Sequence, residues 1–257
     1  MINKVVAFGC SFVIGDGMGE QWRGVSYHEK PLAIYYLGKE LGLGRDKCVI
    51  MAGGGTSNQS FHRNFYHYIT DVENQKSLDE TLFVFGWTEK SRWEFYSDVE
   101  KTWIPITVDR LIPGPWPNWS KIVLNILSVL PNKRYEKLVK EYYKVSFNLK
   151  KHFEKSIREI ISVQNTCKVK KLQYIMFDSI ESVFQERPKN KLVKLLDKKY
   201  WINWDGNYSD WVTMNIKNLK EYTAYGNTED HPSALSQKVW GNYLISMVKR
   251  LYNNKEK

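Results

Sequence analysis

Short runs of consecutive apolar residues alternate along this chain with longer segments in which apolar residues recur every three or four positions. Residues 5–8 form a continuous apolar run and the other runs are largely apolar, which predicts strands buried on both faces of a sheet. They lie at residues 5–8, 48–51, 81–85 and 171–177. The periodic segments predict helices at residues 31–41, 59–72, 135–163 and 234–251. Because strands and helices alternate, we predict an α/β fold, a three-layer α/β/α sandwich around a parallel sheet of about five strands.

The length and the uneven composition favour one domain with two insertions. At 257 residues the chain can bury a large core, and we expect a single domain over residues 1–257. Residues from about 96 to 132 are rich in proline and aromatic side chains, and residues from about 180 to 225 are basic and aromatic. Prolines hold a segment extended and aromatic side chains offer contact area. The first insertion is therefore interpreted as a lid, a substrate platform, an oligomer contact or a loop packed on the core.

The formal net charge is +10, from 38 Lys and Arg against 28 Asp and Glu. Such a charge is typical of proteins that bind polyanions. Much of it lies in residues 168–171, 189–199 and 249–257. However, no zinc-finger spacing, RNP motif or helix-turn-helix is evident in the sequence. The abundance of Lys, Asn, Tyr and Ile is also what an AT-rich genome would produce. We therefore interpret the charge as a solvated basic surface, with nucleic-acid binding as an alternative.

The distribution of apolar residues and cysteines indicates the compartment. No apolar run is long enough to span a bilayer, and the amino terminus lacks the apolar core of a signal peptide. We expect a protein folded in a cytoplasm. The three cysteines, Cys10, Cys48 and Cys167, form neither a CxxC pair nor a metal-like cluster. We expect neither a cofactor nor a metal ion.

The first predicted strand ends in a glycine-rich loop that carries a nucleophile-type side chain. Gly9 breaks the strand, Ser11 follows it, and Gly15 and Gly17 come shortly after. Ligands and catalytic side chains collect at the carboxyl ends of parallel strands, so Ser11 is placed to attack a substrate. The alternatives are an ordinary turn, or a thiol nucleophile at Cys10, which we instead expect to pack as a small apolar residue.

This stretch resembles block I of the SGNH (GDSL-like) hydrolases, in which Gly-x-Ser-Phe-x-x-Gly-Asp-Gly follows the first strand. The matching positions are Gly9, Ser11, Phe12, Gly15, Asp16 and Gly17. The resemblance implies the SGNH hydrolase fold, with a parallel, flavodoxin-like sheet. It also implies that Ser11 is the nucleophile and that its backbone N–H belongs to the oxyanion hole.

A second glycine-rich loop, residues 53–58, follows the second predicted strand. Bare backbone here lets N–H groups approach a developing oxyanion, although a tight strand-to-helix turn also uses glycine. The loop resembles the corresponding loop in SGNH-like proteins of tailed phages through Gly55, Ser57, Asn58 and Arg63. This resemblance implies that Gly55 is a donor in the oxyanion hole.

After the third predicted strand the sequence departs from most of the family. Thr88 stands where the family has an asparagine that donates to the oxyanion. Losing one such donor can cost on the order of 10²–10³ in rate. Asn58, one loop away, is a candidate substitute. Arg92 and Glu94, which follow, are interpreted as a structural ion pair beside the site.

Residues 226–233, just before the closing helix, resemble block V of the family, where Asp-x-x-His-Pro supplies the acid and the base. The resemblance implies His231 as the general base. The position of the acid is occupied by Thr228, which cannot orient an imidazole as a carboxylate does. Phage-type members often carry the acid two residues before the histidine, which points to Glu229. Asp230 remains an alternative.

Together these motifs imply a serine hydrolase that cleaves an acyl ester, of esterase or deacetylase type, on a small-molecule, glycan or lipid substrate. The alternative is a catalytically inactive protein that keeps the fold and binds a ligand or forms part of a phage virion, alone or as a homo-oligomer. The altered third and fifth blocks favour the alternative, and the intact Ser11 and His231 favour the enzyme. A phage-encoded protein would reside in the host cytoplasm or be incorporated into a virion.

Overall fold

A five-stranded parallel sheet organises the molecule. The computed structural model describes residues 1–15, 18, 25–89, 92–99, 101–106, 148–180, 183–186, 190–202, 206, 208 and 232–252. The strands of the sheet are β1 (Lys4–Gly9), β2 (Cys48–Ala52), β3 (Thr81–Trp87), β6 (Gln173–Asp178) and β7 (Trp201–Ile202). Their order is β2-β1-β3-β6-β7, and each neighbouring pair is parallel. Counted along the chain this is the flavodoxin-like order, so the predicted arrangement is confirmed.

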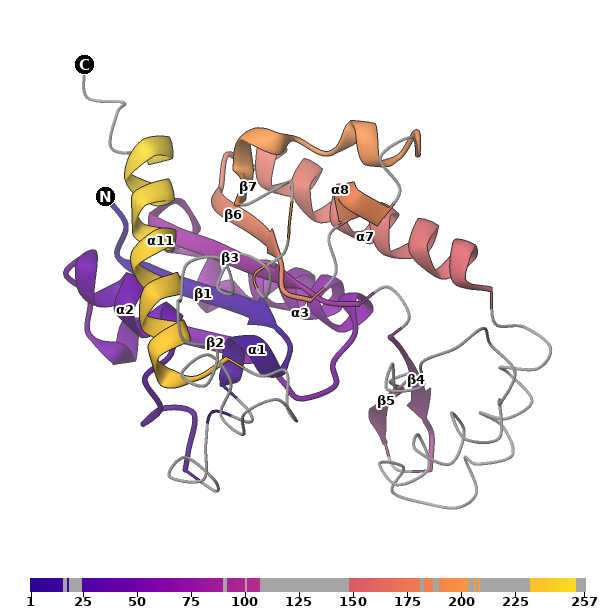
Figure 1. Cartoon of the computed structure of the whole chain (residues 1–257), viewed down its shortest axis with the longest axis horizontal. Coiled ribbons are helices and arrows are strands. Elements are labelled where there is room, and N and C mark those ends of the chain that lie inside the picture. The colour runs from indigo at the N-terminus through magenta and orange to yellow at the C-terminus, as the bar shows by residue number, and fades with distance from the viewer. Residues whose placement is uncertain are drawn as a thin grey trace.

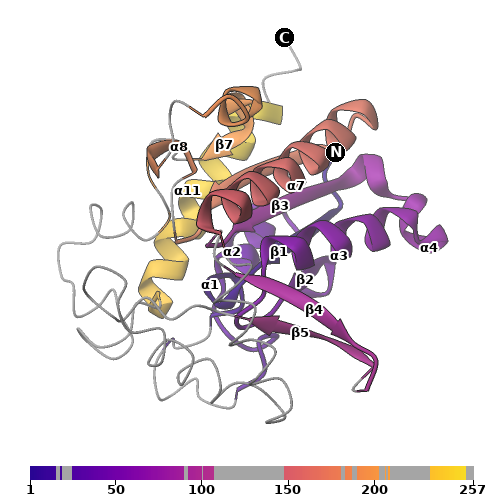
Figure 2. The same cartoon turned by 90° about the vertical axis from the view of Figure 1, so that its right-hand side faces the viewer.

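Helices cover both faces of the sheet. On one face, α2 (Ala33–Glu40) packs against α11 (Ala234–Tyr252), and on the other, α3 (Asn58–Thr70) packs against α7 (Leu149–Val169) (Figures 1 and 2). Close approach of α11 to α2 depends on Gly241, where an added Cβ would lie 2.8 Å from the carbonyl oxygen of Ala33. The shorter helical elements are α1 (Ser11–Ile14), α4 (Val72–Gln75), α8 (Val183–Glu186) and the 3₁₀ turns Arg45–Lys47, Leu78–Glu80, Val193–Leu195 and Lys198–Tyr200. The predicted three-layer sandwich is confirmed.

Aromatic side chains fill the space between the sheet and α3. The rings of Phe8 and Phe85, on neighbouring strands, stack with centroids 5.1 Å apart. Phe65 of α3 meets both of them edge to face, at 6.0 Å and 5.3 Å. These contacts bury the continuous apolar runs that predicted the strands, because each strand faces a helix layer on both sides.

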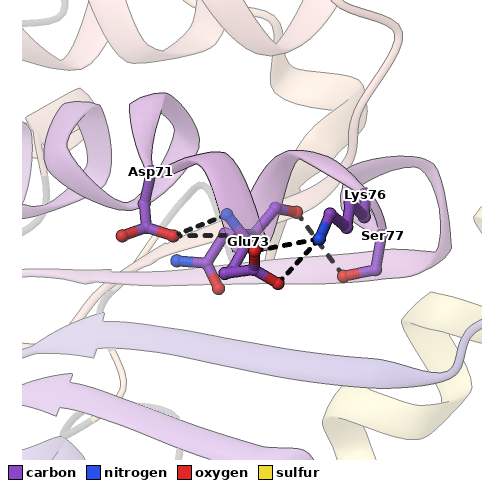
Figure 3. Close-up of polar contacts among 5 residues, drawn as sticks. Asp71, Glu73, Lys76 and Ser77 are labelled. Atoms are coloured by element: carbon purple, nitrogen blue, oxygen red, sulfur yellow. Dashed lines mark hydrogen bonds and ion pairs between the residues drawn. The ribbon is translucent and has the colours of Figure 1, made fainter.

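The helix predicted over residues 59–72 is α3, which ends at Thr70, and the short helix α4 follows it after a sharp break. The break is at Asp71, whose extended backbone ends α3 and whose carboxylate accepts the N–H groups of Glu73 and Asn74, at 3.0 Å and 3.2 Å (Figure 3). This is N-capping of α4, and an ion pair of 2.9 Å between Lys76 and Glu73 follows it. Aspartate is a strong N-cap residue, so the sequence carried the signal for this break.

Several elements fall in the stretches that were predicted to be insertions. β7 belongs to the central sheet although it lies within residues 180–225, and Trp201 is almost fully buried there. An antiparallel hairpin, β4 (Trp93–Ser97) and β5 (Thr102–Ile106), enters the other stretch and lies away from the central sheet (Figure 1). The rest of the predicted 96–132 insertion, from residue 107 on, and residues 135–147 of the predicted helix lie outside the described residues. That helix ends at Val169 and not at residue 163.

A largely buried ion pair connects the hairpin to α3. Arg63 of α3 pairs with Glu94 of β4, whose side chain is 3% exposed. The same guanidinium lies over the ring of Trp103 on β5, 4.2 Å from its centroid. The predicted pairing of Arg92 with Glu94 is therefore wrong. Glu94 lies on the hairpin face that meets α3, and Arg92 precedes the strand and pairs with Glu89 at 3.5 Å.

A buried carboxylate on α7 is influenced by the charge of Glu94 on the hairpin. One carboxylate oxygen of Glu159 on α7 is shielded from solvent and has no hydrogen-bond partner among the described residues. Burial raises the pKa of Glu159 to about 7, the charge of Glu94 adds to this shift, and Lys155 opposes it. Because the folded pKa exceeds the unfolded value, Glu159 stabilises the fold fully below pH about 4.5, and this contribution is lost as the pH rises through about 7.

Replacing the Glu159 carboxylate with an uncharged amide should therefore stabilise the protein at pH values above about 7. We expect Glu159→Gln to raise the free energy of unfolding at about pH 8 by about 2 kcal/mol and to change it little at about pH 4. Urea unfolding at both pH values measures the difference. Glu154→Gln on the same helix is the control, because Glu154 forms only an exposed pair with Arg158 at 3.7 Å. An unchanged pH dependence in Glu159→Gln would show that Glu159 ionises as freely as it does in the unfolded chain.

Within the described parts of the chain, no helix is both long enough and apolar enough to cross a bilayer.

Candidate functional site

Ser11 lies where the topology of the sheet places a ligand site. It is the first residue of α1, directly after the carboxyl end of β1. β1 lies between β2 and β3, so the chain leaves it toward one side of the sheet and later returns on the other, and ligands bind at such a switch point. As the first residue of a helix, Ser11 has no intrahelical acceptor for its N–H. Ser11 is 6% exposed and is thus largely buried.

The position of α1 depends on two strand glycines. A Cβ at Gly86 of β3 would lie 2.9 Å from Cγ2 of Val13, and a Cβ at Gly9 of β1 would overlap the same methyl group and lie 2.8 Å from Cβ of Val13. Val13 therefore packs directly on the backbone of both strands. This contact holds the short helix, and with it Ser11, against the ends of β1 and β3.

The second glycine-rich loop is bonded to the same strand end. The carbonyl oxygen of Gly9 accepts hydrogen bonds from the N–H of Gly53 at 3.2 Å and from the hydroxyl of Thr56 at 3.1 Å. Between these two residues, Gly55 has a φ of 71°, in the left-handed region that glycine adopts without strain. The structure thus brings the Gly55 loop beside the turn that carries Ser11.

Asn58 and Thr88 are joined to each other by a pair of hydrogen bonds. The carboxamide oxygen of Asn58 accepts the N–H of Thr88 at 2.9 Å, and its nitrogen donates to the carbonyl oxygen of Thr88 at 3.1 Å. Both residues are 1% exposed. The hydroxyl of Thr88 is shielded from solvent and has no hydrogen-bond partner in the described part of the chain. The side chain of Asn58 thus ties the start of α3 to the end of β3, with one amide hydrogen left beyond this pair.

The segment after β3 holds a second buried pair. The carboxylate of Glu89 and the guanidinium of Arg92 lie 3.5 Å apart, and their side chains are 9% and 12% exposed. The ion pair holds the chain where it turns from the sheet toward the hairpin. Together with the Asn58 tie, it fixes the backbone on both sides of Thr88.

The closing helix is tied to the Ser11 turn by a residue that the sequence analysis missed. The carboxamide nitrogen of Gln237 on α11 donates to the carbonyl oxygen of Phe12 at 2.7 Å, and its oxygen accepts the N–H of Ala33 at 2.9 Å. Gln237 is 1% exposed. A signal was available, because Gln237 is a polar residue in the apolar stripe of α11 that continues through Trp240 and Leu244.

Three of the predicted site residues, His231, Glu229 and Asp230, lie outside the described residues, as do Asp16 and Gly17 of the first motif. Description of the chain resumes at Pro232, which is buried and lies two positions before the start of α11. Cys10, the alternative nucleophile, is fully buried. Within the described ranges no group of three or more His, Cys, Asp or Glu side chains is arranged to hold a metal ion.

Comparisons with known proteins give similarity at the level of structure only. No protein-family model matches the chain, and no curated protein matches it significantly. A carbohydrate esterase, described as having divergent catalytic and non-catalytic binding functions in its active site, is 10% identical with a TM-score of 0.49. That match covers 97% of this chain and 65% of the esterase, so this chain spans less than two thirds of its length.

Two further solved structures are similar over most of both chains. A putative acylhydrolase from Bacteroides fragilis NCTC 9343 is 12% identical with a TM-score of 0.41, over 96% of this chain and 87% of that one. A GDSL-like lipase from Bacteroides thetaiotaomicron VPI-5482 is 12% identical with a TM-score of 0.30, over 96% and 88%. At these identities and TM-scores the likeness identifies neither an activity nor a site residue of this chain.

Proposed function

We propose that this protein is a serine hydrolase that cleaves an acyl ester. The observation that carries the proposal is the position of Ser11, at a helix start at the switch point of a parallel sheet and beside the bare backbone of the Gly55 loop. This arrangement supports acyl transfer because the reaction needs a nucleophile next to backbone N–H groups that receive an oxyanion. The motif around Ser11, which resembles block I of the SGNH hydrolases, supports the same class.

In the proposed reaction, the Ser11 hydroxyl attacks the ester carbonyl while His231 takes its proton. The N–H groups of Ser11 and Gly55 receive the negative charge on the carbonyl oxygen, with Asn58 or Thr88 as a third donor. The carbon–oxygen bond of the ester breaks, the alcohol leaves with the proton from His231, and the acyl group stays on Ser11. Water, activated by His231, then releases the acid and restores the serine.

The contact made by Gln237 supports the participation of His231. Gln237 lies six residues after His231 and its side chain bonds to Phe12, the residue after Ser11. The start of α11 is thus held against the turn that carries the nucleophile, and His231 comes just before this helix in the sequence.

Labelling with a fluorophosphonate probe tests the proposal. Such probes react with serines that a neighbouring base activates, so we expect one label, at Ser11, found by peptide mass spectrometry. The label should be lost in His231→Ala. Failure of the probe to react at any pH at which the protein is folded would overturn the proposal. It would instead favour the alternative of a binding or virion protein that kept the fold, an alternative supported by Thr88 and Thr228 at the family's donor and acid positions.

The choice between the two candidate acids gives a separate prediction. In an extended loop alternate side chains share a face, so Glu229 can turn with His231 while Asp230 points away. We expect Glu229→Gln to reduce turnover strongly, although by less than the roughly 10⁴ of the serine-protease case, and Asp230→Asn to have little effect. Ester hydrolysis rates of the two variants, with circular dichroism to check the fold, measure this. Equal small effects would indicate a Ser-His dyad, and a larger effect of Asp230→Asn would identify Asp230 as the acid.

A further inference from the structure

A groove runs along α2 and the turn that follows it, and its lining shares no residue with the candidate active site. Its volume is about 380 Å³, and its lining includes Pro31, Tyr35, Tyr36, Lys39, Leu43 and Arg45. We refer to it as the α2 groove. Its size falls within the range of pockets that hold small organic ligands.

The charge of the α2 groove has one sign. Lys39 and Arg45 line it, no carboxylate does, and the side chain of Lys39 makes neither a hydrogen bond nor an ion pair with the described residues. One nitrogen of Arg45 donates to the carbonyl oxygen of His28 at 2.6 Å, and the guanidinium lies over the ring of Tyr35, 4.7 Å from its centroid. Arg45 is thereby held in place, and a guanidinium has five N–H donors, so most of them are left for a ligand. Asp46 is close in sequence but pairs with neither cation in the described part of the chain.

The remaining lining is flat and largely apolar. Tyr35 is 6% exposed, and its ring is fixed between the core and Arg45. Tyr36 and Leu43 are half-buried and Pro31 closes one end. Aromatic and proline surfaces pack well on rings, so the ligand that fits here has a ring next to its charged group.

We propose that the α2 groove binds a small molecule that carries a phosphate group on a ring, with the phosphate between Arg45 and Lys39 and the ring against Tyr36 and Pro31. Two cations from separate elements suit a doubly charged group better than a single carboxylate, and the planar guanidinium can make two parallel bonds to phosphate oxygens. A nucleotide and a sugar phosphate share this chemistry. The α2 groove does not include Ser11, so the proposed ligand site can be tested separately from the proposed hydrolase activity.

The test is calorimetric titration of the full chain with four probes: adenosine monophosphate, ribose 5-phosphate, adenosine and inorganic phosphate. At about 50 mM salt, where charges are weakly screened, we expect saturable one-to-one binding of a phosphate ester with a Kd below about 1 mM. Adenosine and inorganic phosphate alone should each bind at least about tenfold more weakly, because each lacks one half of the ligand. Tighter binding of adenosine monophosphate than of ribose 5-phosphate would assign a nucleotide, and similar binding would assign a sugar phosphate.

Variants distinguish this groove from the general positive charge of the surface. Arg45→Gln and Lys39→Gln should each weaken binding about tenfold, whereas Lys47→Gln, which removes the same charge from an exposed residue outside the lining, should change it less than about twofold. Asp46→Asn should strengthen binding, because it removes the nearest negative charge in sequence. Ser11→Ala should bind as the unaltered protein does. Equal binding of adenosine and its monophosphate, an equal effect of Lys47→Gln, or no saturation at about 10 mM would overturn the proposal.

Discussion

Ser11→Ala is expected to abolish ester hydrolysis, by a factor of at least about 10³, while the unfolding temperature changes by no more than about 4 °C. The hydroxyl is the proposed nucleophile, and alanine has no group that can replace it. Removing the Ser11 hydroxyl adds no atom to the contact between Val13 of α1 and the strand glycines, so the fold should persist. Hydrolysis of an activated acyl ester and thermal unfolding, measured on the same preparations, check both parts of the expectation.

Cys10→Ala is the matched control, because it changes the neighbouring residue by a similar amount. It should keep most of the activity, since the thiol of Cys10 is fully buried and is proposed to be a packing group. Loss of activity in Cys10→Ala together with retention in Ser11→Ala would identify the thiol as the nucleophile. Unfolding of Ser11→Ala would mean that Ser11 is needed for the structure and would remove the main support for the hydrolase.

Gly9→Ala is expected to lower the free energy of unfolding by about 3 kcal/mol. The added methyl group would overlap a methyl of Val13 and lie 2.8 Å from its Cβ, and a β-branched side chain cannot turn away cheaply. α1 must then move off the sheet, so fluorophosphonate labelling of Ser11 should also fall. Denaturant unfolding and the extent of labelling measure the two effects.

A second substitution tests whether this contact is the cause. In Gly9→Ala combined with Val13→Ala, the methyl groups of Val13 are gone, and the double variant should lose less stability than the sum of the two single variants. Gly42→Ala is the contrasting control. Gly42 has a φ of 77° and open space around it, so alanine there costs only the backbone strain of about 1–2 kcal/mol. A Gly9→Ala variant as stable as the parent would show that α1 is free to shift on the sheet.

The sheet could be predicted from the sequence as far as its strands are long and buried on both faces. Continuous apolar runs marked β1, β2, β3 and β6, but β7 consists of two residues and has no pattern of its own. It becomes a strand only because β6 offers it a free edge. The hairpin strand β5 contains Pro105, which breaks the expected pattern yet is tolerated in a two-stranded ribbon that leaves an N–H position unpaired.

For the candidate site, too, the sequence predicted the residues that follow a local pattern and missed the contacts between distant parts of the chain. Ser11, Gly55 and Thr88 were found because each follows a strand, and the carboxyl ends of parallel strands meet at one edge. The contact of Asn58 with the backbone of Thr88 could not be found, because it joins residues 30 positions apart and depends on how α3 is set against β3. Gln237 was missed for the same reason, since its partner Phe12 is 225 positions away.

The two residues joined by the bond between Gln237 and Phe12 are synthesised at different times, because they lie 225 positions apart in the chain. The turn with Ser11 is made first, and the side chain that ties it down is made more than two hundred residues later. During translation β1, β2 and β3 can pair while α1 still lacks this tie, because domains begin to form from the amino end. A nascent chain that stops short of α11 would thus carry the nucleophile without the helix that holds its turn in place.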